Sequence, residues 1–364
     1  MRSLPLPLIR RLVPMKGLSE HSLQVLLDQS DWQLIGRGQR LFSMADFGRY
    51  YFFILSGEAA FYYPEGKIVH TPEVLFPLGY GMSGLISSIA VTDCVCLRID
   101  KNLLDRQLCW DHVAAAIELD LSYRSGYDDE EGWRLTLLKS NLFVKVPPLN
   151  VEQIFSCLRP MQVNAGDVIV RQGESGSGGG CYFIRRGMAA VTRRHPDEDI
   201  DRHIVDIGYG RCFGEDALIY ETVRNASVTM VTDGLLMRLD KPDFMLLLRE
   251  PEVDHIKSAD LDVALARGSQ LLDVRISEEF GVARMLDAIN TPLACLRLLM
   301  TSKLGIGRDY IVYCDTGTRS RAAVTFLQRQ GFRARYLLNG MNGLGSDQRS
   351  RFFDVIPPLS PQPL

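Results

Sequence analysis

Glu215 and Arg224 lie nine positions apart and carry the two kinds of side chain needed to hold a nucleotide. A guanidinium grips phosphate oxygens through parallel N–H groups, and a carboxylate accepts a hydrogen bond from a ribose hydroxyl. Gly214 lets the backbone approach a ligand, and a short helix expected over 216–221 would direct free N–H groups at an anion. A surface ion pair on a β-rich domain is the alternative interpretation, and the spacing alone does not decide between them.

The segment around this pair reads Phe-Gly-Glu-Asp-Ala-Leu over 213–218, then Arg-Asn-Ala over 224–226 and an alternating strand pattern over 227–230. It resembles the phosphate-binding cassette of cyclic nucleotide-binding domains, as in protein kinase A regulatory subunits and catabolite activator protein. The resemblance implies a cyclic nucleotide as ligand, with Glu215 on the ribose and Arg224 on the phosphate. The nucleotide-binding residues it implies are Gly214, Glu215, Asp216, Ala217, Arg224, Asn225 and Ala226.

The base of the nucleotide is less well defined by this segment. Asn225 stands where relatives often carry alanine or threonine, a position associated with the choice between adenine and guanine. Pro251 follows soon after the apolar run 244–249, so the helix that usually closes over the base is either missing or borrowed from the next domain or a second subunit. We predict cyclic AMP as the ligand in preference to cyclic GMP. This segment by itself does not determine the base.

A second candidate for chemistry is Cys314, which directly follows the apolar run 310–313 and precedes a predicted helix. A thiol at a strand end facing a helix N-terminus is activated, because backbone N–H groups and the positive helix end stabilise its thiolate. Arg319 would add to this effect if its side chain faces inward. Most cysteines are inert core residues, but this position predicts a nucleophile.

The loop Cys-Asp-Thr-Gly-Thr-Arg-Ser over 314–320 resembles the active loop Cys-x-x-Gly-x-Arg-Ser of rhodanese domains, and the resemblance extends over about 258–344. It implies that Cys314 takes a sulfane sulfur as a persulfide and passes it to a nucleophilic acceptor, while loop amides hold the charge of the donor. Related phosphatases have a loop one residue longer, so this length favours sulfur over phosphorus transfer. The implied catalytic residues are Cys314 and Arg319, and the rest of the active loop is Asp315, Thr316, Gly317, Thr318 and Ser320.

The chain departs from the rhodanese pattern in its framework and in its loop. Residues 283–287 read Ala-Arg-Met-Leu-Asp where relatives often have Gly-His-Ile-Pro-Gly, and the usual tryptophan near the end is absent. Asp315 adds a negative charge beside the nucleophile, which should raise the thiol pKa and disfavour an anionic donor such as thiosulfate. We therefore expect weak activity with thiosulfate at most.

The elements that must position the first site form a weak internal repeat. Amphipathic helix patterns over 18–27 and 149–158 are each followed by a glycine turn and short β-runs, with Gly57 and Gly187 at equivalent places. This spacing predicts two α+β units, each a small antiparallel β-roll with flanking helices. In the first copy, the segment 76–92 that aligns with the cassette contains no arginine, lysine or glutamate, so we predict a structural or interface module there.

From about Ile256 the pattern changes to strands alternating with helices. Apolar β-runs at 270–275, 310–313 and 336–338, with a helix predicted over 320–330, indicate an α/β domain with a mostly parallel sheet. The working site of such a sheet lies at the carboxyl ends of its strands. The predicted domains are 1–126 (degenerate cyclic nucleotide-binding-like roll), 127–252 (cyclic nucleotide-binding domain) and 256–352 (rhodanese-like domain).

Composition limits the partners. The 364 residues are 46% hydrophobic and 23% charged, as in soluble globular proteins, and favour two or three domains. A net charge of −3 argues against nucleic-acid binding, and no apolar run is long enough to span a membrane. The N-terminal segment lacks the uninterrupted apolar centre of a secretory signal. Eight scattered cysteines without a CxxC predict no metal and a reducing, cytoplasmic setting.

Three functions remain open from the sequence. The first is a sulfurtransferase regulated by a cyclic nucleotide, with a small sulfur donor or thiol acceptor as its other partner. The second is a non-catalytic signalling or scaffold protein whose rhodanese domain senses persulfide or redox state. The third is a sulfurtransferase whose rolls only mediate assembly, which an intact Glu215–Arg224 pair argues against. A homodimer is also left open, although no heptad seam is visible.

Overall fold

The computed structural model describes residues 6–64, 66–80, 85–124, 132–138, 140, 146–175, 179–195, 200–220 and 222–355. It consists of two compact units. Unit 1 combines Met1–Ala116 with Val253–Leu364, and unit 2 is Ile117–Glu252. The N-terminal and C-terminal parts thus pack together as one unit, while the three domain boundaries taken from the sequence remain predictions. Within the described ranges, no helix has the length and apolar character needed to cross a bilayer.

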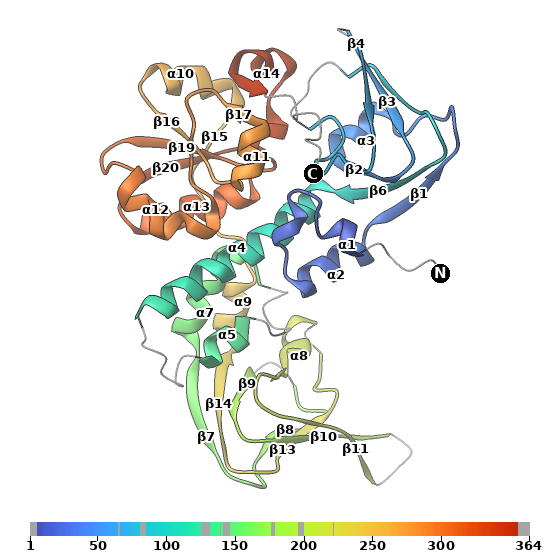
Figure 1. Cartoon of the computed structure of the whole chain (residues 1–364). Helices are drawn as coiled ribbons and strands as arrows, with labels where there is room; N and C mark the ends of the chain where they lie inside the picture. Colours follow the sequence, from blue (N-terminus) through green and yellow to red (C-terminus); the bar gives the residue numbers. More distant parts are fainter. Residues whose placement is uncertain are drawn as a thin grey trace. The chain divides into compact units, whose positions relative to one another are not determined.

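The first part of unit 1 is a pair of three-stranded antiparallel sheets, which we call the N-terminal roll (Figure 1, blue to cyan). Alternating apolar residues turn one face of each strand inward, and aromatic rings such as Phe52 and Phe61 fill the space between the sheets. The strand orders are β1-β6-β2 and β4-β3-β5. Their bounds are β1 (Asp31–Ile35), β2 (Tyr50–Ser56), β3 (Ala59–Tyr63), β4 (Gly66–His70), β5 (Ser87–Ala90) and β6 (Cys94–Asp100).

Helices cover the outer face of the sheet β1-β6-β2. Ser19 caps α2 by accepting a hydrogen bond from Ser22 N–H, and the helix buries Leu23 and Leu26 against Phe53 of β2. The long helix α4 begins directly after β6. The helices of this part are α1 (Leu6–Ile9), α2 (Glu20–Asp28), α3 (Met44–Arg49) and α4 (Lys101–Arg124).

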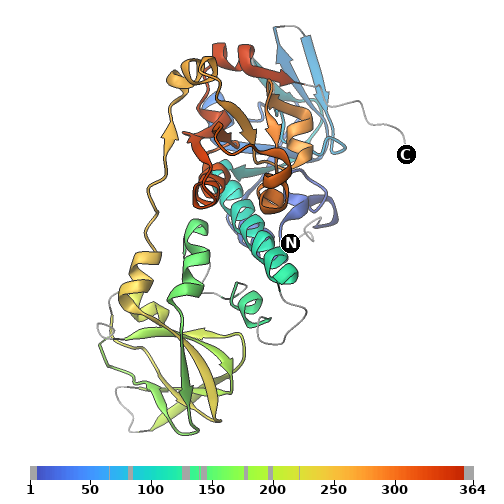
Figure 2. The same cartoon turned by 90° about the vertical axis from the view of Figure 1, so that its left-hand side faces the viewer.

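Unit 2 contains a second roll with the same strand pairing (Figure 2, green to yellow). Its sheets are ordered β12-β9-β14-β7 and β11-β10-β13-β8, so β7·β14·β9 and β11·β10·β13 repeat the pairings β1·β6·β2 and β4·β3·β5 of the N-terminal roll. The strands are β7 (Arg159–Val163), β8 (Val168–Val170), β9 (Gly180–Arg186), β10 (Ala189–Arg194), β11 (Asp201–Ile207), β12 (Cys212–Phe213), β13 (Ser227–Met230) and β14 (Gly234–Asp240). The helices are α5 (Gly132–Leu138), α7 (Val151–Cys157), α8 (Glu215–Ile219) and α9 (Lys241–Leu247).

The C-terminal part of unit 1 is a five-stranded sheet of order β15-β20-β19-β16-β18, and every pairing in it is parallel, as predicted. Figure 1 shows α12 and α13 on one side of this sheet and α10 and α14 on the other. The strands are β15 (His255–Ile256), β16 (Gln270–Asp273), β18 (Ile289–Asn290), β19 (Asp309–Tyr313) and β20 (Arg333–Leu337), with the antiparallel pair β17 (Ala283–Met285) and β21 (Phe353–Val355) beside them. The helices are α10 (Leu261–Ala266), α11 (Ser277–Val282), α12 (Leu296–Lys303), α13 (Thr318–Arg329) and α14 (Ser346–Phe352).

Candidate functional site

The Cys314 loop connects the end of β19 to the start of α13, where the sequence predicted it. Gly317 adopts a left-handed conformation (φ 99°) just before α13, and its N–H donates to Cys314 Sγ at 3.2 Å. Ser320 Oγ lies 3.7 Å from the same sulfur. A Cβ added at Gly340 would lie 2.2 Å from the Cys314 carbonyl oxygen, so the backbone packs too closely there for any side chain.

Asp105, a residue of α4 that sequence reasoning did not identify, faces this loop. Its Oδ2 accepts hydrogen bonds from Cys314 Sγ at 3.2 Å and from Thr316 Oγ1, whose oxygen lies 3.0 Å from Thr318 Oγ1. Asp105 Oδ1 forms a close ion pair with Arg319 Nε. Asp105 is 3% exposed and Cys314 is fully buried. The helix that follows the N-terminal roll therefore supplies a carboxylate that closes over the thiol.

Arg319 faces inward, which was the condition for its predicted effect on the thiol, but carboxylates surround it. Its Nη1 and Nη2 donate to the two oxygens of Glu279 at 2.7 and 2.9 Å, and Nη2 lies 3.6 Å from Asp315 Oδ2. Arg319 and Glu279 are both almost completely buried. Burial raises the pKa of Glu279 to about 7, while Arg319 pulls that pKa down. The guanidinium is thus engaged with protein groups on three sides.

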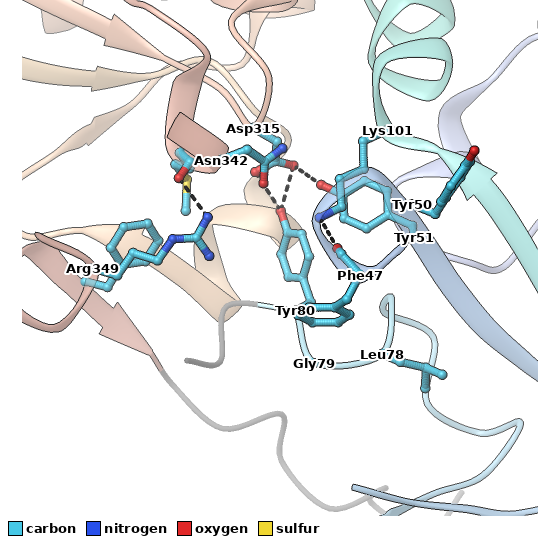
Figure 3. A pocket seen from close by; sticks show the side chains of 12 residues that line it. Phe47, Tyr50, Tyr51, Leu78, Gly79, Tyr80, Lys101, Asp315, Asn342 and Arg349 are labelled. Atoms are coloured by element: carbon cyan, nitrogen blue, oxygen red, sulfur yellow. Dashed lines mark hydrogen bonds between the residues drawn. The ribbon is translucent and has the colours of Figure 1, made fainter. Parts of the chain in front are cut away.

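The Asp315 carboxylate faces two tyrosines of the N-terminal part (Figure 3). Tyr51 and Tyr80 donate to Asp315 Oδ2 at 3.0 and 3.1 Å, and Arg275 donates to Oδ1 at 3.1 Å. Arg275 also holds Asp273, and both of these side chains are fully buried. Burial opposes the charge on Asp315, but Arg275 and Arg319 together hold its pKa below the usual value. We call the cluster of Asp315, Tyr51, Tyr80 and Arg275 the tyrosine clasp.

The expectation of an activated Cys314 thiolate is wrong for this conformation. Burial raises the pKa of the thiol to about 12, and Asp105 adds to the rise, whereas Arg319 lowers it. Asp315 also raises this pKa, in the direction expected, but less than Asp105 does. The loop N–H groups and the helix end are present as predicted. Their effect is outweighed because the sulfur lies in a closed site beside a carboxylate.

In unit 2, the predicted pair Glu215 and Arg224 lies at the start of α8. Gly214 has φ 91° immediately before this helix, so it supplies the left-handed turn. Arg224 Nη1 donates to the Gly214 carbonyl at 2.5 Å and Nη2 to the Gly180 carbonyl at 2.9 Å. Glu215 and Arg224 are 6% and 5% exposed. The alternative of an exposed surface ion pair therefore does not describe this pair.

The other predicted nucleotide-binding residues flank this turn. Ala217 and Ala226 are buried, whereas the side chains of Asp216 and Asn225 are exposed. The Asn225 carbonyl accepts a hydrogen bond from Arg193 Nε at 3.0 Å. The helix α8 ends at Ile219, so it is shorter than the predicted run 216–221, whose last residue lies outside the described ones.

The corresponding segment of the N-terminal roll, 76–92, has a different role in its described part. Residues 81–84 lie outside the described residues. Tyr80, just before them, belongs to the tyrosine clasp and also accepts a hydrogen bond from Arg275 at 2.8 Å. Tyr80 thus joins this segment to the C-terminal part of unit 1, and the structural or interface role predicted for the first copy stays a prediction.

All eight cysteines are free thiols. In the ranges that the structure describes, no group of three or more His, Cys, Asp or Glu side chains could hold a metal ion.

Two family models match separate parts of the chain. Residues 160–250 match a cyclic nucleotide-binding domain, and residues 258–347 match a rhodanese-like domain. The first match contains Glu215 and Arg224, and the second contains the whole Cys314 loop. Each match covers one region rather than the whole chain.

Curated relatives are similar to part of this chain. The cAMP-dependent protein kinase regulatory subunit of Schizosaccharomyces pombe is 34% identical over 125 residues, covering 33% of this chain and 29% of the relative. That of Eremothecium gossypii is 25% identical over 236 residues, covering 64% of this chain and 47% of the relative. The matches therefore span less than half the length of both relatives.

Solved structures similar to this chain include the regulatory domain of Toxoplasma gondii protein kinase A with cAMP. It is 18% identical, with a TM-score of 0.30, over 72% of this chain and 93% of that chain. From the two family matches, this chain combines a cyclic nucleotide-binding domain, like that of protein kinase A regulatory subunits, with a rhodanese-like domain that follows it.

Proposed function

We propose that this chain binds cyclic AMP at Glu215 and Arg224, carries a persulfide on Cys314, and changes access to Cys314 when the nucleotide binds. The observation that carries the proposal is the buried Arg224 guanidinium beside Gly214, inside the region that matches a cyclic nucleotide-binding domain. Its two hydrogen-bond acceptors are neutral carbonyls. A phosphate is a stronger acceptor for a guanidinium, so a cyclic phosphate would displace or join these carbonyls.

Cyclic AMP is favoured over cyclic GMP because the curated relatives quoted above are named for their dependence on cAMP. The exposed side chain of Asn225, at the position associated with base choice, leaves this preference to experiment. Glu215 would accept from the ribose hydroxyl.

Sulfur transfer through Cys314 takes two steps. The Cys314 thiolate attacks the outer sulfur of a sulfur donor, the donor S–S bond breaks, and the leaving group departs with its electron pair. With thiosulfate this leaving group is sulfite. An acceptor thiolate then attacks the outer sulfur of the Cys314 persulfide, and the Cys314 thiolate leaves. These steps and the eight free thiols fit a reducing, cytoplasmic setting.

The N-terminal roll is, in this proposal, a copy of the cyclic nucleotide-binding fold that has lost its ligand site. The repeated strand pairing supports this, as does the 236-residue match to one regulatory subunit, which is longer than a single domain. Helix α4 runs from Lys101 to Arg124, past Ala116, where the first stretch of unit 1 ends. The same helix carries Asp105. One continuous helix therefore connects the start of unit 2, which holds the nucleotide site, with the residue that contacts the Cys314 thiol.

A non-catalytic sensor is the second candidate, and one observation favours it. Cys314 is fully buried and its pKa is raised to about 12, which slows any reaction with a donor until the site opens. In this case the persulfide or the oxidised thiol at Cys314 would signal the persulfide or redox state, and Cys314 would not catalyse repeated sulfur transfer. Mass spectrometry of the Cys314 peptide during repeated exposure to donor and acceptor separates the two: a catalyst cycles, whereas a sensor stays modified.

Calorimetric titration with cyclic AMP and cyclic GMP tests the nucleotide site. Arg224→Ala removes two charge-assisted hydrogen bonds, together about 3 kcal/mol or more, so the affinity should fall about 100-fold or more. Arg171→Ala is the matched control, because Arg171 is 65% exposed and its ion-pair partner is Glu174 at 3.9 Å. If neither nucleotide gives a heat of binding, the binding proposal is refuted. If the Cys314 peptide stays unmodified after treatment with a sulfur donor, the proposal that Cys314 carries a persulfide is refuted.

A further inference from the structure

Asp105 occupies the place in the Cys314 loop where a negatively charged reagent would have to bind. Its two oxygens contact the Cys314 sulfur, the Thr316 hydroxyl and the Arg319 guanidinium. These are the thiol, a hydrogen-bond donor and the nearest cation of the loop. An anionic donor that approached the sulfur would need the same donor groups, so it would compete directly with this carboxylate.

Two further features make this contact more than chance packing. Asp105 is 3% exposed, and a buried carboxylate is costly unless it is paired. Within the part of the chain that the structure describes, the hydrogen bonds and the ion pair of its side chain all go to the Cys314 loop. Arg319 has a second carboxylate, Glu279, which satisfies its other edge with two hydrogen bonds. The positive charge of the loop is therefore already balanced when Asp105 is in place, and no net attraction for an anion is left.

We propose that Asp105 is a specificity-determining residue for Cys314: its carboxylate acts as a built-in competitor that excludes anionic sulfur donors and selects uncharged ones. The inference extends the proposed sulfur chemistry. It also assigns the discrimination against anions to Asp105 instead of Asp315, whose carboxylate is held by Tyr51, Tyr80 and Arg275. Cys314 is fully buried and its Sγ lies 3.2 Å from Asp105 Oδ2, so a reagent at the sulfur would meet this carboxylate at contact distance.

Alkylation tests this without requiring sulfur transfer, so its failure can be distinguished from failure of the proposed function. The full-length chain is treated with iodoacetate, which is anionic, or iodoacetamide, which is neutral and of similar size. The rate at Cys314 is followed by mass spectrometry of its peptide. The ratio of the two rates reports charge selection, because thiol pKa and general access affect both reagents alike.

Asp105→Asn should raise the iodoacetate-to-iodoacetamide ratio at Cys314 about tenfold or more, since it removes one charge within contact distance of the sulfur. Asp111→Asn is the matched control: it changes a carboxylate of the same helix whose partners are Ser19 and Ser22, and it should leave the ratio unchanged. Equal acceleration of both reagents in Asp105→Asn, or no change, would overturn the proposal, because Asp105 would then be a plug or a bystander.

The wild-type chain supplies a second measurement that does not depend on a variant folding. Cys295 is half-buried and lies outside the loop, so it serves as an internal reference. The iodoacetate-to-iodoacetamide ratio should be lower at Cys314 than at Cys295 by about tenfold. Equal ratios at the two cysteines would count against Asp105 as the selecting group even if Asp105→Asn proved unstable.

Discussion

The tyrosine clasp offers a quantitative test of how the two parts of unit 1 are joined. Tyr51→Phe removes a hydroxyl that donates to the buried Asp315 carboxylate at 3.0 Å. A hydrogen bond to a charged, buried group contributes about 1.5–3 kcal/mol. Asp315 keeps Tyr80 and Arg275, so we expect a loss near the middle of this range, about 2 kcal/mol in the free energy of unfolding. For a unit of this size, that lowers the melting temperature by about 4–8 °C.

Tyr63→Phe is the matched control in the same roll. The Tyr63 hydroxyl is buried and has no hydrogen-bond partner among the described residues, so its removal should be neutral or stabilising. Urea and thermal unfolding of the two variants measure the difference. A double-mutant cycle with Asp315→Asn should give a coupling energy of about 1 kcal/mol or more between Tyr51 and Asp315. If Tyr51→Phe proves as harmless as Tyr63→Phe, the clasp does not hold these parts together.

Two pH-dependent predictions follow from buried groups. Since the pKa of Cys314 is raised to about 12, its iodoacetamide labelling in the wild type should keep rising with pH beyond the range where an ordinary cysteine thiol, with a pKa of about 8.5, levels off. Asp105→Asn should move that profile to lower pH, and an unmoved profile would argue against the Asp105 contact. Burial also lowers the pKa of His70 to about 4, and neither ring nitrogen has a partner among the described residues. The unfolded state therefore binds the proton more tightly, so stability is lost as pH falls from about 6.5 to 4, by roughly 3 kcal/mol from this residue. His70→Phe should reduce that acid-induced loss in urea titrations across this range, and an unchanged loss would refute it.

The loop of the C-terminal domain was predictable because its chemistry is local in sequence. A strand that ends at Tyr313, a left-handed glycine at 317 and a following helix place Cys314 and Arg319 on one short segment. The same holds for Gly214 and Glu215, while backbone hydrogen bonds with Gly173 and Glu174 hold Arg224 in place. Local turn preferences and strand pairing fix these positions with little help from distant residues.

The state of the thiol was not predictable, because distant residues determine it. Asp105 is 209 positions from Cys314, and Tyr51 and Tyr80 are 264 and 235 positions from Asp315. A lone aspartate on a helix carries no sign of such a contact, and neither does a tyrosine on a strand, such as Tyr51, or in a turn, such as Tyr80. Packing of the N-terminal roll and α4 against the C-terminal part of unit 1 reverses the effect of the loop, which then keeps a buried thiol instead of stabilising a thiolate.

The measurement that tests the central claim most directly is the rate of sulfur loading on Cys314 with and without saturating cyclic AMP. An uncharged sulfane-sulfur donor is used, and the Cys314 peptide is followed by mass spectrometry in the wild type and in Arg224→Ala. We predict that cyclic AMP increases the loading rate in the wild type and has no effect in Arg224→Ala. A loading rate that is the same with and without the nucleotide in the wild type would contradict the link between the two sites.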